Sequence, residues 1–429
     1  MNLRGSLLVV LFFLVLPLLQ AWDYLNTQTF ADMLDNTNFV SSIFAYNWLL
    51  LNVLIGLKVP VLQNPLPYDL RIRIHVWTTL GLVLLLAWHA VYYMALKVKF
   101  IDLVDWSLVA VFLGLVVLSA LWIPLPGLKA VRARILGGIR WGLLRSYDFL
   151  KVSHKVLFFA LAGLTYLHVV AAKLIGVASP WSSFWFQALF VVTAAFFLWT
   201  RIQNLTLPAL TVRSVATEGG IVRLGLEGHG RLRYRSGQFA FLRFDHPQLR
   251  GEEHPFSFTT AGHEEGVGFA VRALGDFTSR LVHLKPGDRV RINGGFGAFH
   301  PPRGVAPLAL IGSGIGAAPL VSILKEVGHR EHDREVVCLL SVNRRDELVE
   351  AEALEALRHT MPHLRLRIFV FEEDGLLYGR ELLAQELGDP LRYRYYLCSS
   401  DKVRTIVAGA LRKLGVRRAR IHFEAFNLG

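Results

Sequence analysis

The sequence predicts a multi-domain membrane protein: a six-helix transmembrane bundle, then an antiparallel β-barrel domain, then an α/β domain with a parallel sheet. Of its 429 residues, 53% are hydrophobic, and the mean hydropathy is +0.41, which is high for a soluble protein. The apolar runs lie before about residue 205, and short strand patterns and then alternating strands and helices follow. We therefore expect domains over residues 1–205, 206–303 and 304–429.

Six apolar runs in the first domain are long enough to cross a bilayer. The expected spans are Leu3–Trp22, Ile43–Leu62, Asp69–Leu96, Leu103–Ile123, Tyr147–Ile175 and Phe184–Ile202. The first run also resembles a signal peptide, but no clean small-residue cleavage site follows it, so we expect a retained helix. The polar stretch Asp23–Ser42 is expected to form an exposed loop.

The basic residues orient these spans. The formal net charge is +13, but the cations form no stripe with interleaved aromatics, so we expect no nucleic-acid partner. The segment Gly127–Lys151 carries six Lys or Arg residues against one Asp, which places it in the cytoplasm by the positive-inside rule. The N-terminus and the two later domains are then cytoplasmic, and the protein is multi-pass in the cell (inner) membrane. The two cysteines, Cys338 and Cys398, suggest no disulfide framework.

Two of the spans carry histidine pairs at one spacing. His75 and His89 lie in one span and His154 and His168 in another, each pair 14 residues apart. That separation is nearly four turns, so each pair shares a helix face, with the rings about 21 Å apart along the axis. Ionisable residues inside a bilayer are rare and functional by default. Two such helices side by side would hold an iron between facing histidines at two depths, giving two bis-histidine b-type haems. Hydrogen-bonded core histidines and a proton or other metal site are the alternatives.

Two basic residues lie close to these histidines in the sequence. Arg71 is four residues before His75, on the same helix face, and Lys151 is three residues before His154. Each is a candidate partner for a haem propionate, and each is equally explained by the positive-inside rule.

After Thr206 the pattern becomes short strands and turns at regular spacing, which predicts a small antiparallel barrel. The strand His254–Thr260 reads HPFSFTT, in which an aromatic ring precedes a hydroxyl, a pair able to stack on a flavin and bond its edge. The segment Arg272–Leu281 offers Gly275, Thr278 and backbone amides at a helix start for a diphosphate. Taken alone, both are also ordinary strand and helix-cap sequences.

From Pro307 strands alternate with helices, which predicts a parallel, doubly wound sheet. Directly after its first strand comes a glycine turn containing Gly312, Gly314 and Gly316. Glycines there let backbone amides approach a pyrophosphate at a helix N-terminus. The turn departs from the full dinucleotide-binding pattern, and glycine turns also serve packing alone.

The combination resembles the NADPH oxidase and ferric reductase superfamily, with the closest likeness to the prokaryotic NADPH oxidases. It rests on the six spans with paired histidines, SGQFAFL (Ser236–Leu242), HPFS and GSGIGAAP, and covers essentially the whole chain. The resemblance implies a ferredoxin-reductase-like module after the haem bundle, with FAD in the barrel and NAD(P)H on the parallel sheet. No calcium-binding extension precedes the first span, so the resemblance implies a form without EF-hand regulation.

The resemblance also implies roles for individual residues in the barrel. FAD would be held by the four HPFS residues, with Phe256 at the isoalloxazine and Ser257 near its reactive nitrogen, and its diphosphate by the segment that follows. The implied FAD residues are His254, Pro255, Phe256, Ser257, Gly275, Phe277 and Thr278.

In the α/β domain the three turn glycines would bind the nicotinamide dinucleotide. Arg344 or Arg345 would meet its ribose or 2′-phosphate, which favours NADPH over NADH. Phe426 would cover the flavin and move to admit nicotinamide. Cys398 is followed by Ser399-Ser400 where the family has Gly-Pro, so the nicotinamide-side geometry stays open. Ser257, Cys398 and Phe426 are the candidate catalytic residues.

The implied activity is a transmembrane NAD(P)H oxidase. NAD(P)H gives a hydride to FAD, and single electrons pass to the haem of His75 and His154, then to that of His89 and His168. The acceptor outside is O2, giving superoxide. One alternative is reduction of ferric chelates or a partner protein by the same path; another is a non-catalytic membrane haem subunit. The oligomeric state is not predicted.

Overall fold

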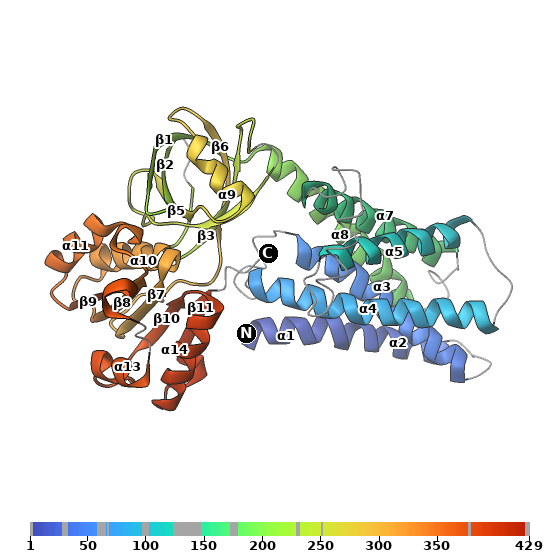
Figure 1. Cartoon of the computed structure of the whole chain (residues 1–429). Helices are drawn as coiled ribbons and strands as arrows, with labels where there is room; N and C mark the ends of the chain where they lie inside the picture. The colour runs from blue at the N-terminus through green and yellow to red at the C-terminus, as the bar shows by residue number, and fades with distance from the viewer. Residues whose placement is uncertain are drawn as a thin grey trace. The chain divides into compact units, whose positions relative to one another are not determined.

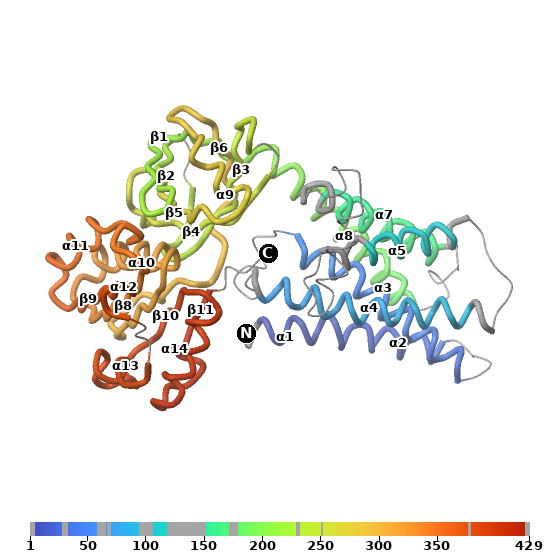
Figure 2. Tube along the Cα trace, in the orientation of Figure 1, coloured from blue at the N-terminus to red at the C-terminus, as the bar shows by residue number. Residues whose placement is uncertain are grey.

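The computed structural model divides the chain into two compact units, one up to Leu205 and the other from Thr206 (Figures 1 and 2). Each unit is described by itself. The residues described are 3–27, 33–57, 66, 68–96, 103–122, 147–171, 179–228, 232–249, 252–375 and 379–424.

The first unit is helical. Its first helix runs through a short π-helical segment, Leu11–Val15, that joins α1 to α2. The helices are α1 (Leu3–Val10), α2 (Leu16–Thr27), α3 (Met33–Gly56), α4 (Tyr68–Leu96), α5 (Leu103–Trp122), α7 (Tyr147–Ala171) and α8 (Pro180–Leu205). Five of the described helices are long and apolar enough to cross a membrane. In α5, the helix expected as the fourth span, the described apolar stretch is shorter, Trp106–Val117. Most of the basic segment expected in the cytoplasm lies outside the described residues.

The prediction of an exposed loop over Asp23–Ser42 is wrong at both ends. Helix α2 continues to Thr27, and α3 begins at Met33, ten residues before the expected span. The physical reason is that two of the polar residues in the first turns of α3 are buried. Asn38 is 2% exposed and Ser41 is 9% exposed, so polarity there marks buried contacts rather than contact with water.

Helix α3 forms the centre of this unit and packs against α2, α4, α7 and α8. Its buried residues include Tyr46, whose hydroxyl donates to the Phe186 carbonyl at 2.7 Å, and Asn47, which bonds Gln20 at 2.7 Å. Polar side chains that bond each other between helices suit a low-dielectric interior, where an unpaired group is costly. The α4 and α7 helices that carry the histidines are thus held against a packed neighbour.

The second unit begins with an antiparallel six-stranded sheet in the order β4-β3-β6-β1-β2-β5. Its strands are β1 (Ala209–Glu218), β2 (Ile221–Glu227), β3 (Phe239–Phe244), β4 (His254–Ser257), β5 (Val267–Arg272) and β6 (Arg289–Phe296), with a short helix α9 (Asp276–Arg280) after β5. Just after β4, Phe258 forms an antiparallel bridge to Phe269 of β5, so the two edge strands meet there. The inward residues form one core that includes Phe244, Phe256 and Phe277.

A parallel five-stranded sheet follows, in the order β11-β10-β7-β8-β9. Its elements are β7 (Leu308–Ser313), α10 (Ala317–Arg330), β8 (Val336–Val342), α11 (Ala351–Thr360), β9 (Leu364–Val370), α12 (Phe371–Asp374), α13 (Arg380–Leu387), β10 (Arg394–Cys398), α14 (Asp401–Lys413) and β11 (Ile421–Glu424). Side chains of β7 alternate between two cores, one shared with α10 and α11 and the other with α13 and α14. Helices therefore cover both faces of the sheet, as expected for a doubly wound domain.

Candidate functional site

The four histidines of the helical unit meet in two facing pairs. His75 of α4 lies opposite His154 of α7, with ring centres 6.3 Å apart, and His89 lies opposite His168 at 6.1 Å. Two imidazoles bound to one metal at about 2 Å each have ring centres about 6 Å apart. The spacing of both pairs therefore fits an ion held between the rings. The structure brings together the partners that the sequence pattern predicted.

Two protein ligands per pair limit the kind of metal centre. Within the described ranges, no group of three or more His, Cys, Asp or Glu side chains converges to hold an ion. A metal bound by only two side chains needs its remaining ligands from elsewhere, and the macrocycle of haem supplies four in a plane. The donor set thus fits bis-histidine haem better than a metal bound by protein alone.

The two histidine pairs differ in the hydrogen-bond partners of the histidines on α4. The Nδ1 atom of His89 lies 2.7 Å from the Ser42 hydroxyl and 3.1 Å from the Asn38 side-chain oxygen. Such contacts fix the tautomer and leave the other ring nitrogen for a metal. Sequence reasoning missed both residues because it assigned them to a loop. Their i, i+4 spacing, Asn38 to Ser42, was the available signal.

His75 has no side-chain partner of this kind among the residues that the structure describes. Its Nδ1 atom is buried without a hydrogen-bond partner in that part of the chain. Arg71, one turn earlier, is fully buried and donates from Nη1 to the Leu57 carbonyl at 2.9 Å, so it does not lie at a solvent-facing surface. The side chain of Lys151 lies outside what the structure describes.

The HPFS residues form β4 at one edge of the antiparallel sheet. The His254 ring stacks on Phe277 at 3.9 Å, and its Nε2 atom lies 3.0 Å from Glu252. Phe256 is 9% exposed and packs in the same core as Phe277, so its place at a flavin ring stays a prediction. Pro255 and Ser257 point to the other face of the strand.

Ser257 is the HPFS residue that the structure leaves ready for a ligand. Its side chain is 6% exposed, and its hydroxyl has no hydrogen-bond partner among the described residues. A buried hydroxyl without a partner is unfavourable in a finished fold. A bound group with a polar edge, such as an isoalloxazine, would satisfy it.

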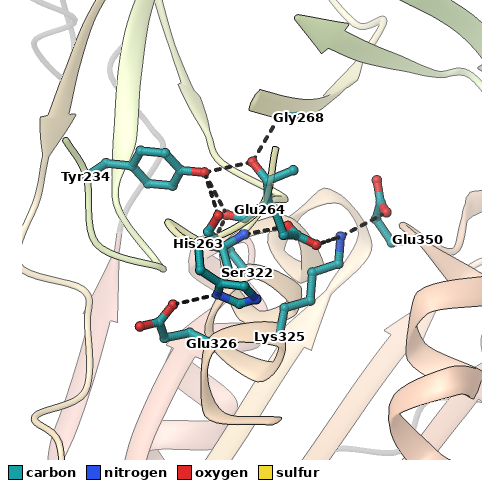
Figure 3. Close-up of polar contacts among 10 residues, drawn as sticks. Tyr234, His263, Glu264, Gly268, Ser322, Lys325, Glu326 and Glu350 are labelled. Atoms are coloured by element: carbon teal, nitrogen blue, oxygen red, sulfur yellow. Dashed lines mark hydrogen bonds and ion pairs between the residues drawn. The ribbon is translucent and has the colours of Figure 1, made fainter. Parts of the chain in front are cut away.

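A polar network fixes the segment that follows HPFS (Figure 3). The Tyr234 ring stacks on Phe258 at 3.8 Å, and its hydroxyl lies 2.9 Å from the Thr260 hydroxyl and 3.0 Å from the Ala261 carbonyl. Burial raises the pKa of Tyr234 to about 12, so the phenol remains protonated and able to donate. Ser322 of α10 donates to the Thr260 carbonyl at 2.6 Å.

Charged residues in Figure 3 tie the same segment to α10 a turn further on. Lys325 lies 3.4 Å from Glu264 and 3.3 Å from Glu350, while His263 lies 3.2 Å from Glu326. These contacts connect the segment that follows β4 with α10. They therefore fix the antiparallel sheet relative to the parallel sheet within the second unit.

The start of α9 presents backbone amides, as the sequence predicted. Gly275 precedes the helix, and the Thr278 hydroxyl accepts from the amides of Gly275 and Leu274 at 2.9 and 3.1 Å. Thr278 is therefore occupied as a helix cap, and the Phe277 side chain is buried. The groups that remain available to a diphosphate are the first backbone N–H groups of α9.

The glycine turn and Cys398 come together at the carboxyl ends of β7 and β10. Gly312 pairs with Cys398 in the parallel register. Gly314 has a positive φ of 54°, and a Cβ at Gly316 would collide with the carbonyl of Cys398. The turn needs glycine because the chain folds back onto β10, at the edge where doubly wound sheets bind ligands. Cys398 is fully buried, and burial and then the charge of Glu424 raise its thiol pKa well above the usual value.

The two arginines predicted for the coenzyme ribose lie after β8 and are exposed. Each is paired with a carboxylate: Arg344 with Asp346 at 2.9 Å and Arg345 with Glu373 at 2.6 Å. Within the same turn Glu347 accepts from Arg272 of β5. A 2′-phosphate would compete with these carboxylates for the guanidinium groups. Phe426, predicted to cover the flavin, lies outside the described residues.

Comparison with known proteins identifies the kind of domain that carries the HPFS residues. Residues 206–286 match the family of FAD-binding domains. The toluate 1,2-dioxygenase electron transfer component of Pseudomonas putida is 26% identical over 201 residues, 44% of this chain and 60% of that protein. The chain spans 60% to 65% of the length of this relative and two similar reductase components.

The match to the Dual oxidases is longer. Dual oxidase 2 of Rattus norvegicus is 25% identical over 318 residues, which are 67% of this chain and 20% of that protein. Because the second unit makes up only about half of the chain, this match extends into the helical unit. Among solved structures, an Amycolatopsis cytochrome P450 reductase aligns with a TM-score of 0.46 and 23% identity, covering 51% of this chain and 70% of that one.

These comparisons place an FAD-binding domain in the first part of the second unit. The chain is related to the electron-transfer components of dioxygenase systems and to the Dual oxidases.

Proposed function

We propose that this chain is a transmembrane NAD(P)H oxidase of the prokaryotic NADPH oxidase type. It would move electrons from cytoplasmic NAD(P)H through FAD and two b-type haems to O2 at the outer face of the cell membrane, releasing superoxide. One observation carries the proposal: two histidine pairs face each other across α4 and α7, with ring centres 6.3 and 6.1 Å apart. The same chain carries an FAD-binding domain.

When bound, the flavin would take up a hydride and release single electrons, and the two irons would carry those electrons one at a time. The chain's own residues place and shield these groups. His75 with His154 and His89 with His168 would hold the two haem irons, one iron between each pair of rings. Ser42 and Asn38 orient His89 from behind.

In the reductase unit, Ser257 would direct its free hydroxyl at the flavin edge, and the first amides of α9 would meet the diphosphate. The glycine turn would receive the dinucleotide next to Cys398, whose buried thiol packs at this edge rather than acting as a thiolate. Phe426 would cover the flavin, as the resemblance implies.

An anaerobic absorbance spectrum of the detergent-purified protein with added FAD tests the electron path. We expect a Soret band, about two haems per chain, and sharp α and β bands after addition of NADPH. Haem that NADPH does not reduce would contradict an active reductase half. A folded preparation without haem would overturn the proposal.

A second candidate function uses the same path but reduces a ferric chelate or a partner protein outside. An assay of cytochrome c reduction with and without superoxide dismutase separates the two. Reduction that superoxide dismutase abolishes supports superoxide as the product. Reduction that it leaves unchanged supports direct transfer to another acceptor.

A further inference from the structure

One edge of the α/β domain carries positive charge that the fold does not compensate. The sequence has no acidic residue between Asp401 and Glu424. Near the end of this stretch, at the C-terminal end of α14 and in the turn before β11, five cations occur within nine residues, and all are exposed. We call this surface the basic edge, formed by Arg412, Lys413, Arg417, Arg418 and Arg420.

One segment of the same domain matches its arginines with carboxylates. Each of the five arginines in the segment from Arg344 to Arg367 lies within ion-pair distance of an acidic side chain. Within the described part of the chain, none of the five cations of the basic edge has such a partner. Arg412 and Arg420 instead donate to backbone carbonyls, those of Ala408 and Leu391. The basic edge therefore gathers five exposed cations in one place without a carboxylate partner among the described residues.

An exposed apolar side chain lies within this charged surface. Leu391 is 53% exposed, its carbonyl accepts from Arg420, and its Cδ2 atom lies 3.6 Å from where a Cβ of Gly415 would stand. Cations around an exposed leucine are typical of surfaces that rest at the headgroup region of a bilayer. A site for a free anion would gain nothing from the leucine.

We propose that the basic edge docks on anionic phospholipid headgroups of the membrane that the helical unit spans. The second unit begins directly after α8, a helix long and apolar enough to span, so the membrane surface is always within reach at high effective concentration. Each cation close to an anionic surface strengthens the contact about fivefold. Five cations together are enough to hold a tethered domain against the bilayer.

A fluorescent label at Ala419 tests this docking in the full chain. Ala419 is exposed within the basic edge, and the two native cysteines, Cys338 and Cys398, are buried. An Ala419→Cys protein is therefore labelled at a single accessible thiol. Energy transfer to headgroup-labelled lipid is measured in neutral nanodiscs and in nanodiscs with about 30% phosphatidylglycerol. The control label is Ala356→Cys, exposed on α11.

We expect transfer from Ala419 to rise about twofold or more in the anionic discs and to return to the neutral value in about 0.5 M salt. The label at Ala356 stays unchanged. Arg417→Glu with Arg418→Glu abolishes the rise, whereas Arg358→Glu with Arg365→Glu, an equal charge change outside the basic edge, preserves it.

Equal transfer in both lipids, or a rise that survives Arg417→Glu with Arg418→Glu, overturns the proposal. Binding that requires an added acidic protein would assign the basic edge to a different partner and overturn it as well. The measurement needs no haem, flavin or nicotinamide, so its failure is separate from failure of the proposed electron path.

Discussion

In the helical unit the candidate ligands lie toward the two ends of two long helices, α4 and α7, whereas in the second unit the candidate residues lie where strands end. Each histidine of α4 has one partner on α7 at the same depth. The reductase site instead draws Ser257 from β4, the glycine turn from β7 and Cys398 from β10, strands that are not consecutive in the chain.

This difference decides how each site responds to change. On a helix, one residue type at the right spacing suffices, and support comes from a neighbouring helix, as Ser42 and Asn38 support His89. At strand ends, the backbone itself is part of the site, because the turn at Gly316 packs on the carbonyl of Cys398. Removal of a histidine side chain should therefore have the larger effect in the first unit. In the second unit, addition of a side chain at a turn glycine should have the larger effect.

The largest expected effect is loss of a haem from one histidine pair. His168→Ala removes the partner of His89, so the haem content should fall from about two per chain to about one. If the proposed electron path holds, electron delivery to the acceptor should fall at least about 100-fold, because one of its two haem sites is lost. The pyridine haemochromogen assay measures the content.

Reduction of the flavin by NADPH under anaerobic conditions should be unchanged in His168→Ala, since that step belongs to the other unit. His359→Ala, an exposed histidine on α11, is the matched control and keeps both haems. Two haems in His168→Ala would refute the assignment of this pair.

The next effect comes from added bulk at the glycine turn. In Gly316→Ala the new Cβ collides with the Cys398 carbonyl, so the turn must shift. We expect kcat/KM for NAD(P)H to fall about 10- to 100-fold, with haem and FAD contents retained. The control is Gly409→Ala, where a Cβ meets nothing within 4 Å inside α14 and should stabilise by about 0.5–1 kcal/mol. Normal turnover in Gly316→Ala would separate this turn from coenzyme binding.

The sequence alone was enough for the histidine pairing because helical geometry converts spacing along the chain into position in space. It also predicted both sheets, since strand periodicity and alternation are local patterns. It failed at residues 33–42, where polar side chains read as a loop. Asn38 and Ser42 are polar because they serve His89, 51 and 47 residues away, a contact no local pattern encodes. The pairing of Arg344 and Arg345 with carboxylates depends on side-chain packing and was equally out of reach.

A smaller effect concerns coenzyme choice at the end of β8. Arg345 is held by both oxygens of Glu373, at 2.7 and 2.6 Å, and the pair is exposed. Glu373→Gln removes the competing charge and frees the guanidinium for a 2′-phosphate. The ratio of kcat/KM for NADPH over NADH should rise about threefold to tenfold, since exposed ion pairs are weak.

Glu355→Gln, which removes a similar exposed carboxylate from α11, should leave the NADPH to NADH ratio unchanged. Arg345→Ala should lower the ratio. A ratio that stays constant in Glu373→Gln and Arg345→Ala would place the 2′-phosphate elsewhere.

The smallest expected effect is a pH dependence confined to the reductase unit. Burial, then the charges of Arg235 and His422, lower the pKa of His300 to about 4, below its ordinary value of 6.5. Between these values the unfolded chain binds the proton more tightly, so stability rises with pH there. The stability that the folded unit gains from neutral His300 is fully present above pH 6.5 and is lost as the pH falls to about 4. His300→Asn should flatten this dependence, measured as release of FAD on acidification.

All ten tryptophans precede Thr206, so tryptophan emission reports the helical unit separately and should not differ between the two proteins. A release curve identical in wild type and His300→Asn would show that other groups govern the acid sensitivity of this unit.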